Sequence, residues 1–330
     1  MTLFDDNPPS PLEENLDVQP SPDQPAESTP AEPFTQPLAG DPLSSMPVCP
    51  SGSFLPPNLP EDLRISWSWP HLLVFVIFVL ASQIALGIAV VAYYSAERHL
   101  SQKQLKQLLE SDPRLIVGTN VLWFALIFLF LYVTLSVLRG LPFWRSLGWK
   151  KLRSDPIESK GSPWMYFLSG CGLSIFVAIA SSRVKDTDHV PIQEFFKNRE
   201  GALSLMAMAV IVAPLVEETV FRGYLYPVLA RITSGVLRFF GMEYCSATRT
   251  GVVTSILVTG TLFGLMHAPQ LGWTWGLVSL LILVGVIFTF ARAWTGTVLA
   301  SFLLHLGYNS TIALTSIIVT KGFTHMPPGH

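Results

Sequence analysis

Long apolar runs limit what this chain can fold into more than any other feature does. Five of them reach the roughly 20 residues that cross the hydrocarbon core of a bilayer, with few or no charges inside. They are His71–Tyr94, Leu115–Leu138, Trp164–Ser182, Leu271–Phe290 and Thr297–Val319. Two further runs, Leu203–Arg231 and Val252–His267, are interrupted by polar residues. The runs predict an all-α, polytopic membrane helix bundle of about seven transmembrane helices, with an eighth if residues 142–149 enter the membrane.

Composition separates the chain into different parts. Only 13% of the residues are charged, against about a quarter in soluble domains. The first 60 residues hold 15 of the 26 prolines and nine acidic residues but no lysine or arginine. Such a segment cannot bury enough apolar surface to offset its ordering entropy, so residues 1–65 are predicted to be a disordered tail. Residues 66–200 are assigned to the first transmembrane helices with an interfacial linker, and residues 201–320 to a second helix bundle.

The distribution of basic residues predicts an orientation. With seven spans, 12 lysines and arginines fall on the side of the N-terminus and nine on the other side. Cytoplasmic loops carry the excess of basic residues, so we expect a cytoplasmic N-terminus in the plasma (inner) membrane. The linker LPFWRSLGWKKLRSD interleaves basic and aromatic residues and is expected to lie at the membrane interface. The lipid bilayer is thus one predicted partner, and no nucleic-acid partner is predicted.

Three charged residues stand inside the run Leu203–Arg231: Glu217, Glu218 and Arg222. A charge near the bilayer centre costs about 3 kcal/mol on insertion scales, so such residues face the protein interior and indicate function. On a helix, Glu218 and Arg222 share one face, whereas Glu217 points about 100° away and has no partner on its own helix. Either Glu217 is a reactive carboxylate that the neighbouring pair supports, or all three form a polar network that joins helices.

Two histidines and an asparagine add to this set. His267 lies one turn after Phe263, and His305 lies one turn before Asn309 in the last span. Counted from the span starts, His267 and His305 lie about 22 Å and about 12 Å from the same membrane face. A carboxylate, two imidazoles and an amide can activate water and stabilise an oxyanion. The carboxylate and the imidazoles are also zinc ligands, so a zinc site is an alternative.

These residues belong to three ordered motifs. They are EETVFR (Glu217–Arg222), FGLMH (Phe263–His267) and HLGYN (His305–Asn309). With EExxxR, FxxxH and HxxxN in this order on successive membrane helices, the chain resembles the CPBP, or Abi, family of intramembrane proteases, which includes type II CAAX prenyl endopeptidases. Each motif alone is unspecific, whereas the ordered set is specific. The resemblance covers a little over a third of the chain, from Leu203 to Thr320.

The resemblance implies an endopeptidase that acts on a membrane-associated or lipidated peptide. It further implies that Glu217 is the general base for the attacking water, with His267 beside it. His305 and Asn309 would then form the oxyanion hole. The predicted partner is accordingly a peptide or protein substrate at the membrane, while the oligomeric state is left open.

The remaining two motif residues, Glu218 and Arg222, would organise the first motif helix. The family is often labelled metalloprotease, yet its motif residues also fit a metal-independent glutamate protease. An amide such as that of Asn309 is a poor zinc ligand, which favours the metal-independent mechanism, with one zinc ion as the alternative cofactor. Two other interpretations stay open: a catalytically inactive family member, and a transporter or immunity-type membrane scaffold.

Overall fold

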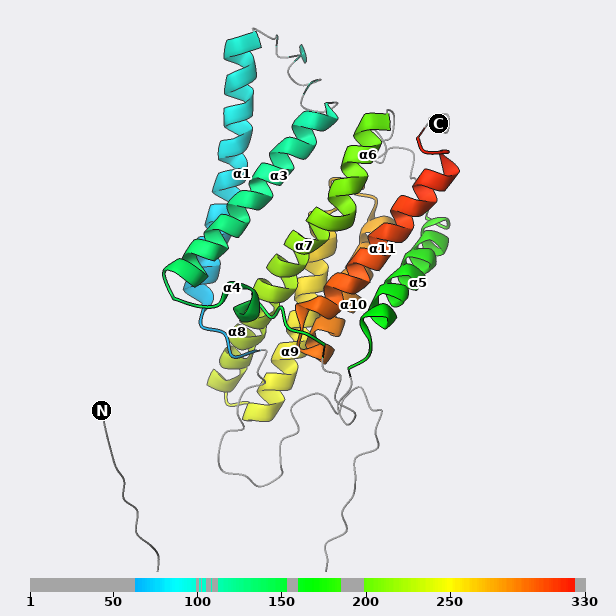
Figure 1. Ribbon diagram of the computed structural model, residues 1–330. Coiled ribbons are helices and arrows are strands. Elements are labelled where there is room, and N and C mark those ends of the chain that lie inside the picture. Colours follow the sequence, from blue (N-terminus) through cyan, green and yellow to red (C-terminus); the bar gives the residue numbers. More distant parts are fainter. Residues whose placement is uncertain are drawn as a thin grey trace, which may run out of the picture. The chain divides into compact units, whose positions relative to one another are not determined.

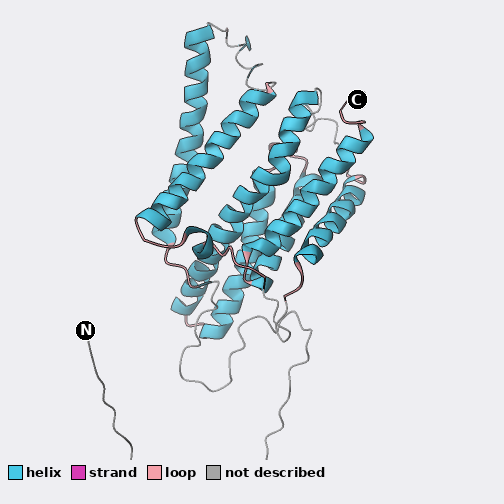
Figure 2. Cartoon of the chain, viewed as in Figure 1, coloured by secondary structure: helices cyan, strands magenta, loops and turns pink. Residues whose placement is uncertain are grey.

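Figures 1 and 2 show the computed structural model of the protein. It describes residues 63–98, 101, 103–104, 108, 112–152, 160–184 and 199–323, all within one compact unit, Gly40–His330. Every regular element of these ranges is a helix. Seven helices are long and apolar enough to cross a membrane. The predicted all-α membrane bundle is therefore confirmed, and the expected tail lies outside the described residues except for its last three positions.

The helices fall into two groups along the chain. The first group comprises α1 (Trp69–Arg98), α3 (Pro113–Tyr132) with its continuation η3 (Val133–Val137), and the single turn α4 (Phe143–Ser146). The second group comprises α5 (Pro163–Ser181), a long composite helix, α9 (Tyr244–Met266), α10 (Trp275–Thr295) and α11 (Val298–Val319). Residues 142–149, considered as an eighth span, contain only α4 and do not cross the bundle.

The long composite helix is a continuous span of 39 residues, Gly201–Phe239. Its parts are α6 (Arg199–Ala207), η5 (Met208–Val212), α7 (Ala213–Glu218), η6 (Thr219–Leu225) and α8 (Tyr226–Phe239). The π-helical segments η5 and η6 each end two residues before a proline, Pro214 and Pro227. Proline lacks an N–H and presses on the carbonyl of the preceding turn, so a local widening lets the helix continue. The expected end near Arg231 was therefore roughly two turns too early.

Glycines bring α5 and α11 into backbone contact. A Cβ added at Gly170 of α5 would lie 2.0 Å from the carbonyl oxygen of Leu304. One added at Gly307 of α11 would lie 2.1 Å from the carbonyl oxygen of Phe167. Only glycine fits at both positions. The crossing holds α11, which carries His305, tightly beside α5.

The start of α9 lies further out than the start of α11. Gly260 of α9 packs against Val286 of α10, and Phe288 of α10 packs on His305 of α11 with ring centroids 4.9 Å apart. About four turns of α9 precede Gly260, whereas about two turns of α11 precede His305. In Figure 1 the α8–α9 end accordingly extends beyond the turn between α10 and α11. Because the sequence counted the depth of His267 from Val252, eight residues after this start, the offset does not bring the two histidines level. Phe263, whose ring centroid lies 5.7 Å from that of His305, is level with His305, and His267 lies one turn further along α9.

The segment just before α1 packs on the bundle. Leu63 is buried in a cluster with Tyr226, and Trp67 stacks on Tyr224 with ring centroids 5.5 Å apart. The Trp67 indole N–H also donates to the Tyr224 carbonyl at 3.4 Å. The packed part of the chain thus begins before residue 65, where the sequence placed the end of the tail.

The linker between η3 and α5 joins two helices of the second group. The amide of Val298, the first residue of α11, donates to the Gly148 carbonyl at 2.9 Å. The Trp149 indole N–H donates to the Thr219 hydroxyl on η6 at 3.1 Å. The linker therefore ties the start of α11 to the helix that carries the two glutamates.

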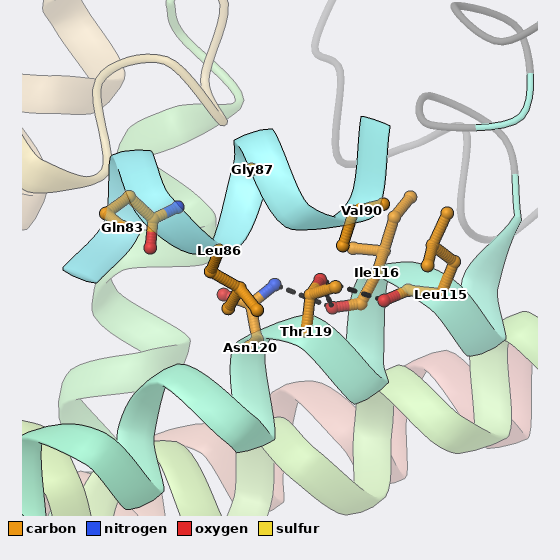
Figure 3. Close-up of a pocket in the computed structure, with 8 residues that line it drawn as sticks. All are labelled: Gln83, Leu86, Gly87, Val90, Leu115, Ile116, Thr119 and Asn120. Atoms are coloured by element: carbon orange, nitrogen blue, oxygen red, sulfur yellow. Dashed lines mark hydrogen bonds between the residues drawn. The ribbon is translucent and has the colours of Figure 1, made fainter. Parts of the chain in front are cut away.

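A small cavity of about 120 Å³ lies between α1 and α3 (Figure 3). Thr119 and Asn120 line it, but their side chains donate to the carbonyls of Leu115 and Ile116 in their own helix at 2.8 Å. The cavity belongs to helices other than those that carry the predicted site residues.

Candidate active site

The two adjacent glutamates lie on α7, in the middle of the long helix. Glu218 is fully buried, and Glu217 is 9% exposed. Arg222, one turn further in η6, is also fully buried and donates through Nη1 to Oε1 of Glu218 at 2.8 Å. The predicted pair between Glu218 and Arg222 is thus present, and the carboxylate of Glu217 is separate from it.

The guanidinium of Arg222 is held on several sides. Its Nη2 donates to the Gly285 carbonyl at 2.9 Å, and its Nε donates to the Thr289 hydroxyl at 3.2 Å, both on α10. The ring of Phe263 on α9 lies 4.5 Å from the guanidinium carbon. Since a buried charge is tolerated only when it is paired and hydrogen-bonded, these contacts lock the helix onto its neighbours.

Glu218 also connects to α11. Its Oε1 lies 2.9 Å from Nδ1 of His305, which is 4% exposed. When this carboxylate is ionised, as its pairing with Arg222 favours, it can only accept, so Nδ1 of His305 carries the hydrogen. The ring of His305 is held by this bond and by the ring of Phe288. Its Nε2 is thereby directed towards the other glutamate.

Glu217 lies between the two histidines. Its Oε2 is 3.9 Å from Nε2 of His305, and its Oε1 is 3.9 Å from Nε2 of His267. His267 caps α9, and its Nδ1 lies 2.9 Å from the Phe263 carbonyl. A carbonyl only accepts, so Nδ1 of His267 donates and Nε2 faces Glu217. Both 3.9 Å gaps are too long for direct hydrogen bonds, and one water molecule can contact both sides of such a gap.

Asn309 lies one turn beyond His305 on α11, and its side chain bonds to the backbone of the long helix. Its Nδ2 donates to the carbonyl of Ala209 at 2.7 Å. Ala209 belongs to η5, the π-helical segment before α7. This bond ties α11 to the long helix at η5, the segment directly before the glutamates of α7. One of the two amide N–H groups of Asn309 is thus used in packing helices, which the sequence did not indicate.

A zinc ion is the alternative cofactor for this set of residues. Within the described residues, no group of three histidine, cysteine, aspartate or glutamate side chains is spaced to hold a metal ion. A histidine that binds zinc uses one ring nitrogen while the other donates to a carboxylate or a carbonyl, so the bonds of Nδ1 in His305 and His267 leave Nε2 of each ring available. The metalloprotease label gains no support from the structure, and the choice between a zinc ion and metal-independent chemistry stays a prediction.

Two residues of the network were missed at the sequence level. Gly285 and Thr289 on α10 both bind Arg222. They lie four residues apart in a run that is otherwise almost entirely apolar. In the sequence, only a glycine and a threonine hydroxyl spaced one turn apart indicate that this face of α10 packs against a polar side chain.

The fold and the site define a class of protein: an integral membrane helix bundle with a buried carboxylate–guanidinium–imidazole network and a second carboxylate facing two imidazoles. Within that class, residues 199–311 match the family model described as Type II CAAX prenyl endopeptidase Rce1-like. The match confirms the resemblance for the segment that holds all the predicted site residues, about a third of the chain. No curated protein and no solved structure matches the chain.

Proposed function

We propose that the protein is an intramembrane endopeptidase that hydrolyses a peptide bond of a membrane-associated peptide. The observation that carries the proposal is the carboxylate of Glu217, almost buried, with an imidazole Nε2 at 3.9 Å from each of its oxygens. The family match to a group of endopeptidases supports the same activity. A carboxylate in a dry site with an adjacent imidazole is the arrangement that general-base catalysis uses.

The reaction needs one water molecule and no covalent enzyme intermediate. A water molecule contacts Oε1 of Glu217 and Nε2 of His267. It gives a proton to Glu217 while the water oxygen attacks the peptide carbonyl carbon. The tetrahedral intermediate then collapses, the C–N bond breaks, and the proton passes to the leaving nitrogen. Glu217 is ionised again at the end, and the products are a carboxylic acid and an amine.

His305 can help only in one protonation state. Because its Nδ1 donates to Glu218, its Nε2 has a hydrogen to donate only when the ring is an imidazolium. We assign the imidazolium form of His305 the role of an oxyanion donor, because a charged donor makes a stronger hydrogen bond to an oxyanion than a neutral one. Asn309 would donate through the amide N–H that does not bind Ala209.

The activity is tested by comparing membrane proteomes of cells that carry the native protein or Glu217→Gln. Gln keeps the shape of the side chain and removes the base. Arg183→Gln, which is exposed just after the end of α5 and outside the site, is the control. We expect cleavage products that are present with the native protein and the control but absent with Glu217→Gln. A properly inserted native protein that generates no such product would instead favour an inactive family member or a transporter.

The mechanism is tested separately by metal analysis. We propose that purified active protein keeps its turnover after exhaustive chelation and holds far less than one equivalent of zinc. About one equivalent of zinc, with activity lost on chelation and restored by zinc, would overturn the metal-independent mechanism but not the proposed activity.

A further inference from the structure

A groove of about 490 Å³ lies where α1 enters the membrane, between the start of α1 and the second half of α8. Its floor contains Trp67 and Val228, both 1% exposed. Its walls include Phe239 and Phe240, which are 85% and 79% exposed. The volume is within the range of ordinary ligand sites. None of the predicted site residues lines it.

The position of the groove fits the membrane interface. Trp69, 62% exposed, begins the first span and forms one edge of the groove. Tryptophan is enriched at this depth because its ring is amphipathic. Ile232 and Val236 continue the wall along α8. An apolar channel that starts at an aromatic edge suits an acyl chain that enters from the bilayer.

The mouth of the groove is basic. Arg231 lines it and donates to the Ile65 carbonyl through one of its five N–H groups. Arg139 donates to the carbonyl of Ser66, which precedes the floor residue Trp67 in the chain. The described residues that precede α1 or connect η3 to α5 include six basic side chains and no acidic one: Arg64, Arg139, Arg145, Lys150, Lys151 and Lys160.

We propose that this groove binds one phospholipid with a negatively charged headgroup. The headgroup lies at Arg231, beside the segment that Arg139 holds through the Ser66 carbonyl, and an acyl chain lies along the apolar wall of α8. Basic clusters at the ends of transmembrane helices attract anionic headgroups by about 1 kcal/mol for each arginine. Arg231 in the lining, together with Arg139 bonded to the residue before Trp67, therefore implies about tenfold or greater preference over a zwitterionic lipid. This lipid site is independent of the proposed peptidase activity.

Gly235 gives a direct test, because it lines the groove and a Cβ added there meets no atom within 4 Å. Gly235→Leu fills the groove without a clash and in a helix that tolerates leucine better than glycine. The matched control is Gly172→Leu on the exposed face of α5, where an added Cβ also meets no atom within 4 Å. Equal thermal unfolding midpoints of the two variants and the native protein verify that all three fold.

The experiment is native mass spectrometry of the full chain in detergent with phosphatidylglycerol or phosphatidylcholine added at equal concentration. We expect the native protein and Gly172→Leu to retain about tenfold more phosphatidylglycerol, and Gly235→Leu to lose about tenfold of that retention. Arg231→Gln should reduce the preference for phosphatidylglycerol while leaving phosphatidylcholine unchanged. Equal retention of the two lipids by the native protein, undiminished phosphatidylglycerol on Gly235→Leu, or a co-purifying peptide that Gly235→Leu releases would each overturn the proposal.

Discussion

At the scale of single residues, Glu217 and Glu218 are chain neighbours with different surroundings. Glu218 accepts from Arg222 and faces Nδ1 of His305, and it is fully buried. Glu217 makes no hydrogen bond within the described site and faces two imidazole nitrogens across 3.9 Å. The helical step of 100° between adjacent residues is the reason for this division.

Glu217→Gln and Glu218→Gln should therefore have different effects. Glu217→Gln is expected to lower turnover by at least about a hundredfold with little change in stability, because only the base is lost. Glu218→Gln leaves Arg222 buried without its counter-charge, which typically costs about 3–5 kcal/mol, so the folded yield should fall as well. Turnover and thermal unfolding of both variants check this. Equal losses of stability in the two variants would contradict the division of roles.

Asn309→Ala should affect catalysis more than folding. The hydrogen bond to Ala209 contributes about 1 kcal/mol, so its loss is a small change in unfolding free energy. Removal of one oxyanion donor usually lowers the rate constant by about a hundredfold or more. We expect that loss in kcat with KM little changed. Native kcat combined with lower stability would mean that the amide only packs helices.

At the scale of helices, the crossing of α5 and α11 is set by two glycines rather than by side-chain chemistry. Gly170→Ala places a methyl group 2.0 Å from the Leu304 carbonyl oxygen, so the helices must separate. Overpacking of this kind costs about 1–3 kcal/mol. We expect a lower thermal unfolding midpoint for Gly170→Ala. Gly172→Ala, on the open face of the same helix, should not lower it, and equal midpoints for the two variants would show that the crossing is not close-packed.

The start of α9 depends on an acidic cap. The Glu243 carboxylate accepts from the amides of Cys245 and Ser246 at 3.2 Å, and these bonds lower the pKa of Glu243 below its ordinary value of 4.5. A lowered pKa means that this stabilisation is complete above the ordinary pKa and is lost as pH falls through the lowered value. Glu243→Ala should thus unfold more readily than the native protein at neutral pH. The difference should vanish in acid, and a difference that persists unchanged there would assign the effect to something other than the charge.

At the scale of the whole molecule, the ordered bundle begins shortly before α1. A truncated chain that starts at Glu61 keeps Leu63 and Trp67 and should insert, fold and retain any hydrolytic activity. A chain that starts at Trp69 loses both buried side chains and the stacking on Tyr224, so its unfolding midpoint should fall by several degrees. Loss of activity in a correctly folded chain from Glu61 would instead show that the acidic tail takes part in substrate recruitment.

The sequence by itself determined the class of fold and the segment, residues 199–311, that matches the endopeptidase family and holds the predicted site residues. Apolar runs of bilayer length specify membrane helices because every backbone polar group in lipid must be bonded within its own segment. The pair of Glu218 and Arg222 also followed from the sequence, since a spacing of four residues places two side chains on one helix face.

Contacts between helices were decided only by the tertiary structure. Local periodicity says nothing about how far one helix is shifted along another, so it could not show that His267 and His305 meet at Glu217. That shift depends on close contacts such as Gly260 with Val286. Local periodicity also could not show that Asn309 would bond to a carbonyl of a π-helical segment. The π-helical widening arises from the strain of a proline inside a continuous helix.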